Sequence, residues 1–318
     1  MKTLDDFRVF YEGELIEDLR ALEARRSGIV LKLLIVVAVL ALIGFGGGIL
    51  MAGAGGPVEV LLFPAIFGIA IPVVVGAFMT KGYKRDFKLR IIERIVRFVE
   101  PGLNYKPTGY IDRETFMMSK IFTTRPNRYK GDDLVWGTVG QTDMKFCELN
   151  AVHESGSGKD KHRVTIFKGL FFVADFHKDF RTKTVVLPDT AEKLFGRLGQ
   201  KLQAMNIFRG KLIKLEDPEF ERQFAVYGDD QIEARYILSP SLMERIVQFK
   251  VKTGRPIHLS FVASNVFVAV SYTRTLFEPR LFRTLLDFSP MQQYFEDVQL
   301  AVGIVDDLNL NTRIWSKQ

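Results

Sequence analysis

Two long apolar runs near the N-terminus constrain this chain more than any other feature of its sequence. Ile29–Leu50 is a run of 22 residues whose single charge is Lys32, and Val60–Met79 is a run of 20 residues without a charge. At about 1.5 Å per residue, a helix of either length crosses the roughly 30 Å hydrocarbon layer of a bilayer. The sequence therefore predicts a transmembrane helical hairpin over residues 29–80, with spans at 29–50 and 60–79.

A signal peptide and a buried hairpin both fit these runs poorly. A signal peptide is disfavoured because 28 residues precede the first run and no clear small-residue cleavage site follows it. A hairpin buried inside a soluble protein is disfavoured because both stretches are long and almost uncharged. Small residues recur every four positions, as at Gly44 and Gly48. This spacing lets helix backbones approach closely, which favours packing within the hairpin over an oligomer or a pore.

The positive charge of the chain is concentrated beside the apolar runs. The 318 residues include 44 Lys and Arg against 37 Asp and Glu, a formal charge of +7. Residues 25–32 carry +3 and residues 81–97 carry +5, whereas residues 1–24 carry −4. We therefore expect a lipid bilayer with anionic headgroups as a partner, and no nucleic acid. The predicted membrane-interface residues are Arg25, Arg26, Lys32, Lys81, Lys84, Arg85 and Lys88.

These basic flanks also predict the orientation. The connection between the runs carries one charge, Glu59, so the positive-inside rule places both termini in the cytoplasm. The protein is expected to be a multi-pass protein of the cytoplasmic membrane. Its single cysteine, Cys147, excludes an internal disulfide and suits a reducing compartment.

Residues 1–28 are predicted to form an amphipathic cytoplasmic arm. Thr3 and Asp6 resemble a capping box, which marks the start of a helix. Apolar side chains then recur at steps of three or four residues, the spacing of one helix face. They are Leu4, Phe7, Tyr11, Leu15, Leu19 and Leu22. Because this arm is acidic, we expect it to pack on the cytoplasmic domain or on a second copy rather than on anionic lipid.

Residues 81–318 are predicted to form a cytoplasmic α+β domain of antiparallel β-hairpins and helices. Turn residues at Gly140–Asp143 and Ser264–Asn265 join neighbouring strand patterns, and blocks of hairpins alternate with helices. The expected strands are Leu134–Val139, Met144–Val152, Arg163–Phe167, Leu170–Phe176, Thr182–Leu187, Ile257–Ala263 and Val266–Tyr272.

Capping residues mark the expected helices of this domain. Asp217 and Ser239 each precede a proline, a combination typical of the N-cap and first-turn positions. The remaining expected boundaries are a helix end at Glu100-Pro101-Gly102 and helix starts at Asp112, Pro188-Asp189 and Ser289-Pro290.

Three separated stretches carry a resemblance to a known family. They are Gly131–Gly137, Phe167–Phe176 and Phe224–Leu238, in that order. These stretches resemble the hallmark sequences of the bacterial domain-of-unknown-function family 3137. The resemblance implies two N-terminal transmembrane helices and a cytoplasmic domain in a bacterial inner membrane. It also implies a membrane-protein partner of the LemA type, with a homo-oligomer as the alternative, and it implies no activity.

The densest polar cluster of the chain is the candidate binding site. Its residues are Tyr227, Asp229, Asp230, Glu233 and Arg235. The structural interpretation makes Asp229 or Asp230 a helix N-cap, with Glu233 in the first turn. The functional interpretation is a carboxylate-lined site in which Arg235 contacts an anion or a partner. Paired carboxylates alone do not make an acid–base pair, so no catalytic residue is predicted.

No metal or cofactor is expected. Cys147 falls in an alternating strand pattern and is interpreted as a buried, unreactive thiol. Ser155–Lys159 lacks the full pattern of a phosphate loop and is interpreted as a flexible hairpin tip. The histidines lack the spacing of metal ligands; they are His153, His162, His177 and His258.

These observations predict a membrane-anchored binding or scaffold protein of unassigned biochemical role. The absence of a catalytic constellation motivates this prediction over an enzyme. The alternative is a membrane-proximal hydrolase or transferase that uses the carboxylates of Asp229, Asp230 and Glu233.

Overall fold

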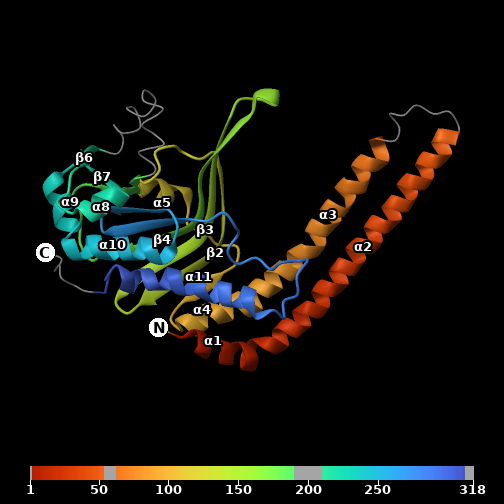
Figure 1. The fold of residues 1–318 in the computed structure, drawn as a ribbon, viewed down its shortest axis with the longest axis horizontal. Coiled ribbons are helices and arrows are strands. Elements are labelled where there is room, and N and C mark those ends of the chain that lie inside the picture. Colours follow the sequence, from red (N-terminus) through yellow and green to blue (C-terminus); the bar gives the residue numbers. More distant parts are fainter. Residues whose placement is uncertain (1, 54–61, 190–209, 312–318) are drawn as a thin grey trace. The chain divides into compact units, whose positions relative to one another are not determined.

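The computed structural model describes residues 2–53, 62–189 and 210–311 and divides into two compact units (Figure 1). The helical unit comprises residues 2–94 and 277–294, and the sheet unit comprises residues 95–276 together with the segment from 295 onward. Residues 277–294 therefore group with the N-terminal helices although they lie far from them in sequence.

The N-terminal arm of the helical unit is helical, as predicted. It consists of α1 (Leu4–Phe10), a π-helical turn η1 (Tyr11–Leu15) and the first part of α2 (Ile16–Gly53). The capping box is present: the Thr3 hydroxyl accepts a hydrogen bond from the Asp6 backbone N–H, and the Asp6 carboxylate accepts one from the Thr3 N–H. All members of the predicted apolar stripe except Leu4 are buried.

The π-helical turn accounts for how this stripe stays on one side. Successive steps of four residues exceed the 3.6-residue turn of an α-helix, so a purely α-helical stripe would drift around the axis. The π-turn accommodates one additional residue. As a result both Tyr11 and Leu15 remain buried.

Two long helices, α2 and α3 (Leu62–Phe87), lie side by side in Figure 1. A Cβ built at Gly76 would lie 3.4 Å from Leu33 Cδ2, so this glycine of α3 packs directly on α2. A second π-turn, η3 (Lys88–Ile92), and α4 (Glu93–Val99) continue the chain. The helix ends at Val99, as the following Glu100-Pro101-Gly102 predicts.

One long helical stretch of the described residues has the length and composition of a membrane span. It is Leu4–Gly44, whose most apolar window has a mean hydropathy of 2.6 and is only 6% buried. The structure thus has one long apolar N-terminal helix, and the second span at 60–79 stays a prediction.

The described part of the sheet unit contains a nine-stranded antiparallel sheet in the order β1-β2-β3-β4-β9-β8-β5-β7-β6 (Figure 1). The α+β class with an antiparallel sheet is therefore confirmed. The strands are β1 (Asn104–Lys106), β2 (Arg128–Val139), β3 (Thr142–Ser155), β4 (His162–Asp175), β5 (Thr184–Pro188), β6 (Lys211–Ile213), β7 (Phe224–Gly228), β8 (Ile257–Val262) and β9 (Asn265–Ser271).

One pair of expected strands is a single strand in the structure. Arg163–Phe167 and Leu170–Phe176 fall together in β4, and Gly169 lies within the strand with φ of 150°. A Cβ built at Gly169 would lie 2.1 Å from the Val270 carbonyl oxygen of β9. Glycine is therefore required by a close backbone approach rather than by a turn.

The capped helices of the sheet unit begin where the sequence predicts. Asp112, Asp217 and Ser239 each accept a hydrogen bond from a backbone N–H of the helix that follows. The helix expected to open at Pro188-Asp189 falls largely on residues 190–209, outside the described residues. The described helices are α5 (Arg113–Met118), η4 (Gly158–Asp160), α8 (Pro218–Gln223), α9 (Gln231–Ile237), α10 (Pro240–Thr253) and α11 (Phe288–Asp307).

The core of the sheet unit is rich in aromatic side chains. Phe171 of β4 contacts Phe116, Phe167 and Phe267, with ring centroids 5.2, 6.3 and 6.2 Å away. Cys147 belongs to the same cluster, and burial raises the pKa of its thiol. A buried thiol of raised pKa is protonated at neutral pH, in agreement with its interpretation as unreactive.

Candidate functional site

The predicted site residues lie where β7 meets α9. Tyr227 is a buried residue of β7, Asp229 follows the strand, and Asp230 is the N-cap of α9. The Asp230 carboxylate accepts hydrogen bonds from the N–H groups of Ile232 and Glu233, at 2.7 and 3.2 Å. The structural interpretation of this cluster, in which one of the two aspartates caps a helix, is therefore confirmed.

Glu233 ties α9 to the preceding loop. Its carboxylate accepts hydrogen bonds from the backbone N–H of Arg181 at 2.9 Å and from the backbone N–H and hydroxyl of Thr182 at 2.8 and 2.5 Å. Burial opposes ionisation of Glu233, but the hydrogen bonds from Thr182 and Arg181 outweigh it and lower the pKa of this carboxyl. Glu233 is therefore an ionised structural clamp.

The remaining charged members of the cluster also have partners within the sheet unit. Arg235 donates to the Lys214 carbonyl at 3.1 Å, and Asp229 pairs with Lys183 at 3.5 Å. The five predicted residues share one region, but their charged groups point to separate partners. This geometry offers capping and loop fixation rather than two carboxylates converging on one point.

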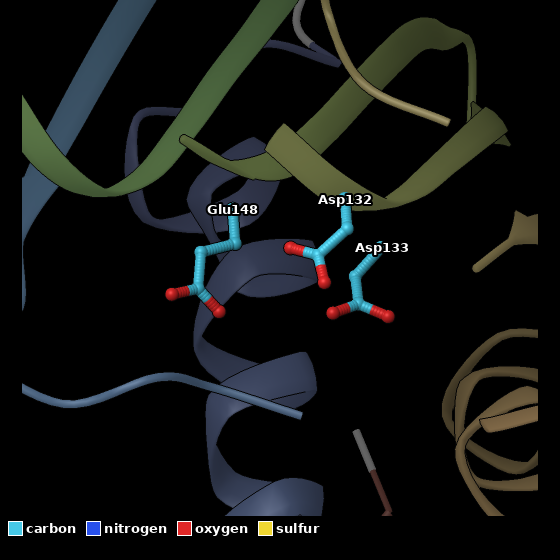
Figure 2. Close-up of side chains that lie close together, drawn as sticks. All are labelled: Asp132, Asp133 and Glu148. Carbon is cyan, nitrogen blue, oxygen red and sulfur yellow. The ribbon is translucent and has the colours of Figure 1, made fainter. Parts of the chain in front are cut away.

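A different set of carboxylates does converge. Asp132 and Asp133 of β2 and Glu148 of β3 place oxygen atoms within 4.8 Å of one another (Figure 2). Asp132 is the register partner of Glu148, and the register shifts between Asp132 and Val135. Asp133 has φ of 58°. Neighbouring side chains of a regular strand point to opposite faces, so this bulge is what gathers both aspartates.

The carboxylate cluster is buried and hydrogen-bonded. Asp133 and Glu148 are buried, the Tyr105 hydroxyl donates to Asp133, and the Leu276 N–H donates to Glu148 at 2.7 Å. Oxygen ligands of this type suit Mg²⁺ or Ca²⁺. All three residues also make other interactions within the protein, so the cluster is not assigned as a metal site. Among the described residues, no histidine joins a group of three potential ligands.

The predicted pairing of β2 with β3 is the one feature of the sequence analysis that bears on this cluster. The register of the predicted hairpin of Leu134–Val139 with Met144–Val152, extended beyond Val135↔Phe146, would place Asp133 opposite Glu148. Asp132 is the partner of Glu148 only because of the bulge, which no residue pattern in the sequence predicts. The cluster is therefore absent from the predicted site residues.

An open groove lies over the neighbouring strands β2, β3, β4 and β9. Its volume is about 320 Å³, within the usual range of ligand pockets. Trp136 is partly exposed in this groove beside Lys145 and Val173, and Asp143 and Asp175 contribute carboxylates. The groove thus combines a partly exposed aromatic side chain with charged neighbours.

The predicted membrane-interface residues fall into two groups in the helical unit. Arg25, Lys32, Lys81, Lys84 and Arg85 are exposed. Arg26 and Lys88 are largely buried, with side chains 13% and 6% exposed, and they pair with Glu23 and Glu278. Five of the seven residues are thus exposed, although Arg25 and Lys84 also pair with Asp86 and Glu278, and the other two hold the helical unit together.

Comparisons with known proteins give a match to one family model and no activity. A search of the curated proteins found no match. Among solved structures, the chain matches the crystal structure of the mycobacterial trehalose monomycolate transport factor A, TtfA, at 8% sequence identity. The match covers 68% of this chain and 96% of that chain with a TM-score of 0.32, a similarity too low to support an inference.

The family match agrees with the resemblance found in the sequence. Residues 165–310 match the family model described as "Protein of unknown function (DUF3137)". The match contains the stretches Phe167–Phe176 and Phe224–Leu238, whereas Gly131–Gly137 lies outside it. Through residues 165–310, this chain is therefore similar to the DUF3137 family of proteins of unknown function.

Proposed function

We propose that this chain is a membrane-anchored binding protein whose sheet unit faces the cytoplasm. The observation that carries the proposal is the exposed surface of α2. Leucine, isoleucine and valine side chains cover it, including Leu34, Ile35 and Leu42. The core helix of a soluble protein would bury such a surface, whereas hydrocarbon solvates it.

The second span of the proposal is α3. The run Val60–Met79 has no charge, and Val73, Val74 and Phe78 are exposed on the described part of the helix. Pro72 lies inside α3, which membrane helices tolerate better than soluble ones. We propose that both termini lie on the cytoplasmic side, because basic residues precede the first span and follow the second.

The binding role rests on the groove with Trp136. A partly exposed tryptophan between charged neighbours is typical of an interaction hot spot. The carboxylates of the enzyme alternative instead cap α9 and fix the loop at Thr182. We therefore propose a membrane-protein partner, or a second copy of the chain, as the occupant.

Affinity purification from native membranes in a gentle detergent tests the binding role. We expect a stoichiometric partner or a defined homo-oligomer with the wild-type chain. Trp136→Ala should reduce recovery at least about tenfold, the effect of losing a hot-spot side chain. Ile232→Ser removes an exposed apolar side chain outside the groove and should leave recovery unchanged. A solitary monomer in the wild-type sample would contradict the proposal.

A further inference from the structure

Loop 278–287 of the helical unit is attached to α2 close to the start of the first apolar run. The Arg26 guanidinium donates to the Leu281 carbonyl at 2.7 Å, and the Leu285 N–H donates to the Glu23 carboxylate at 2.9 Å. The Tyr11 hydroxyl adds a third bond to this loop, to the Leu286 carbonyl at 3.0 Å. The loop backbone is therefore held against the helix.

The two side chains that hold the loop form an ion pair of their own. Arg26 donates to Glu23 from Nε at 2.8 Å and from a terminal nitrogen at 2.6 Å. The hydrogen bonds from Arg26 lower the pKa of Glu23 despite partial burial. A two-point arginine–carboxylate pair fixes geometry as well as charge. The ion pair therefore holds Arg26 and Glu23 in place as the hydrogen-bond partners of the Leu281 carbonyl and the Leu285 N–H.

A second ion pair fixes the start of the loop. Glu278 lies between Lys84 and Lys88, whose ammonium groups are 2.6 and 2.9 Å from its carboxylate oxygens. Burial alone would raise the pKa of Glu278, but the two lysines reverse this and lower it. The Tyr294 hydroxyl also donates to the Glu278 carbonyl at 2.6 Å. The loop is therefore clamped to both long helices of the helical unit.

Between these clamps the loop exposes apolar and basic side chains together. Phe282 is 77% exposed and Leu286 is 42% exposed. Arg280 and Arg283, on either side of Phe282, are exposed as well. A loop that exposes an aromatic ring and two arginine side chains has the composition of a membrane-interface anchor.

The residues that hold the loop also determine how close it lies to the proposed membrane. Arg26 lies three residues before Ile29, where the first apolar run begins, a distance of about 4.5 Å along a helix. Lys81, Lys84 and Arg85 are exposed at the corresponding end of α3. The lipid surface is therefore the occupant that lies within reach of Phe282.

We propose that loop 278–287 is an interfacial membrane anchor: Phe282 inserts at the boundary of headgroups and acyl chains, and Arg280 and Arg283 bind anionic headgroups. The inference deepens the proposed function and rests on it, because α2 must enter the bilayer for the loop to reach lipid. It adds a third contact with the membrane, supplied by a segment far from the spans in sequence.

Depth-dependent fluorescence quenching of the full chain in vesicles tests the inference. Single cysteines carrying an environment-sensitive fluorophore replace Phe282, Leu42 or Val9, and native Cys147 is fully buried. Leu42 lies in the proposed span. Val9, as exposed as Leu42, lies 20 residues before Ile29, about 30 Å along the helix. Nitroxides are placed on the lipids at shallow or deep positions.

We expect the Phe282 probe to be quenched severalfold more strongly by shallow nitroxides than the Val9 probe. The Leu42 probe should respond to deep nitroxides. Equal, weak quenching at Phe282 and Val9 with a quenched Leu42 probe would overturn the inference and leave the anchor intact. An unquenched Leu42 probe would overturn the anchor itself. A blue-shifted but unquenched Phe282 probe would show that protein covers the loop, which also overturns the inference.

A second series of the same experiment varies the charge of the lipids and tests the two loop arginines. Adding phosphatidylglycerol to phosphatidylcholine vesicles should favour the inserted loop by about fivefold per arginine. Arg280→Gln with Arg283→Gln should abolish this dependence on anionic lipid. Arg8→Gln with Arg20→Gln removes the same charge from exposed positions earlier in the arm and should preserve it. Equal behaviour of the two double variants would overturn the role of the loop arginines.

Discussion

The helical unit and the sheet unit expose different kinds of side chain. The helical unit exposes leucine, isoleucine and valine along α2, and it keeps Arg26 of α2 and Lys88 of η3 largely buried in ion pairs. The sheet unit buries phenylalanines such as Phe171 and Phe267 and keeps most of its charges at the surface.

This contrast shows what each unit is built to contact. Burial of apolar area stabilises a fold only where water is the competing solvent. The sheet unit follows that rule, so its stability should depend on its apolar core. The exposed surface of α2 does not follow it, so its side chains should contribute little to the stability of the helical unit apart from their contacts with lipid. Truncations should therefore cost most in the core of the sheet unit and least on the exposed side of α2.

Phe171→Ala should give the largest loss of stability. Phe171 is fully buried and contacts three other phenylalanines, and truncation of such a side chain lowers the free energy of unfolding by about 3–5 kcal/mol. Urea unfolding of the detergent-solubilised protein measures the change. A loss below about 1 kcal/mol would show that this aromatic cluster is not the core of the sheet unit.

Arg274→Ala should destabilise the sheet unit by about 3 kcal/mol, because it leaves the Asp297 carboxylate buried without its arginine. Arg274 bonds both carboxylate oxygens, at 2.7 and 2.5 Å. Burial raises the pKa of Asp297 even with Arg274 present. A carboxyl group whose folded-state pKa is raised contributes its full stability below its ordinary pKa, and this contribution is lost as the pH rises through the folded-state pKa. The loss of stability caused by Arg274→Ala should therefore be largest at neutral pH and decrease in acid. A loss that does not depend on pH would contradict this account.

Glu233→Gln should lower the free energy of unfolding by about 1–3 kcal/mol at neutral pH, because three donors lose a charged acceptor. The folded-state pKa of Glu233 is lowered. Its contribution is therefore present above the ordinary glutamate pKa and is lost as the pH falls through the folded-state value. Denaturation at several pH values should show the variant and the wild type converging in acid. An unchanged stability with loss of partner binding would favour the functional interpretation instead.

Asp230→Ala should lower the free energy of unfolding by about 1 kcal/mol, the usual effect of losing an N-cap. Asp230→Asn is the matched control, because asparagine caps as well as aspartate does and removes only the charge. Thermal denaturation should show a normal Asn variant and a weakened Ala variant. If the Asn variant folds normally but loses a cellular function, the carboxylate has a role beyond capping.

Leu42→Ala should have the smallest effect, within about 0.5 kcal/mol in detergent. Leu42 is 74% exposed on α2, so its truncation leaves no cavity in the protein. Comparison with Phe171→Ala under the same conditions measures the contrast between the units. A loss of several kcal/mol would mean that protein, not lipid, covers this side of α2.

Local signals in the sequence predicted much of the sheet unit. Caps at Asp112, Asp217 and Ser239 and the β8–β9 hairpin were all confirmed. These features depend on hydrogen bonds between near neighbours, which residue identity determines. The strand β7 was missed because five residues beside a polar cluster carry too little periodicity.

Long-range features could not be predicted in the same way. Loop 278–287 joins Glu23 and Arg26 across more than 250 residues, and no local pattern specifies such a contact. The burial of Arg26 and Lys88 has the same origin, because their carboxylate partners become visible only once the chain has folded. The carboxylate cluster of Asp132, Asp133 and Glu148 depends on a bulge as well as on strand register.

The central claim, a two-span anchor with the sheet unit in the cytoplasm, is tested most directly by cysteine labelling in intact cells. Gly55→Cys lies in the connection between the apolar runs, and Ser157→Cys lies at the exposed β3–β4 hairpin tip. Native Cys147 is fully buried and should not react. We predict that a membrane-impermeant maleimide labels Gly55→Cys in intact cells and labels Ser157→Cys only after permeabilisation. Labelling of Ser157→Cys in intact cells, or of both positions alike, would contradict the account.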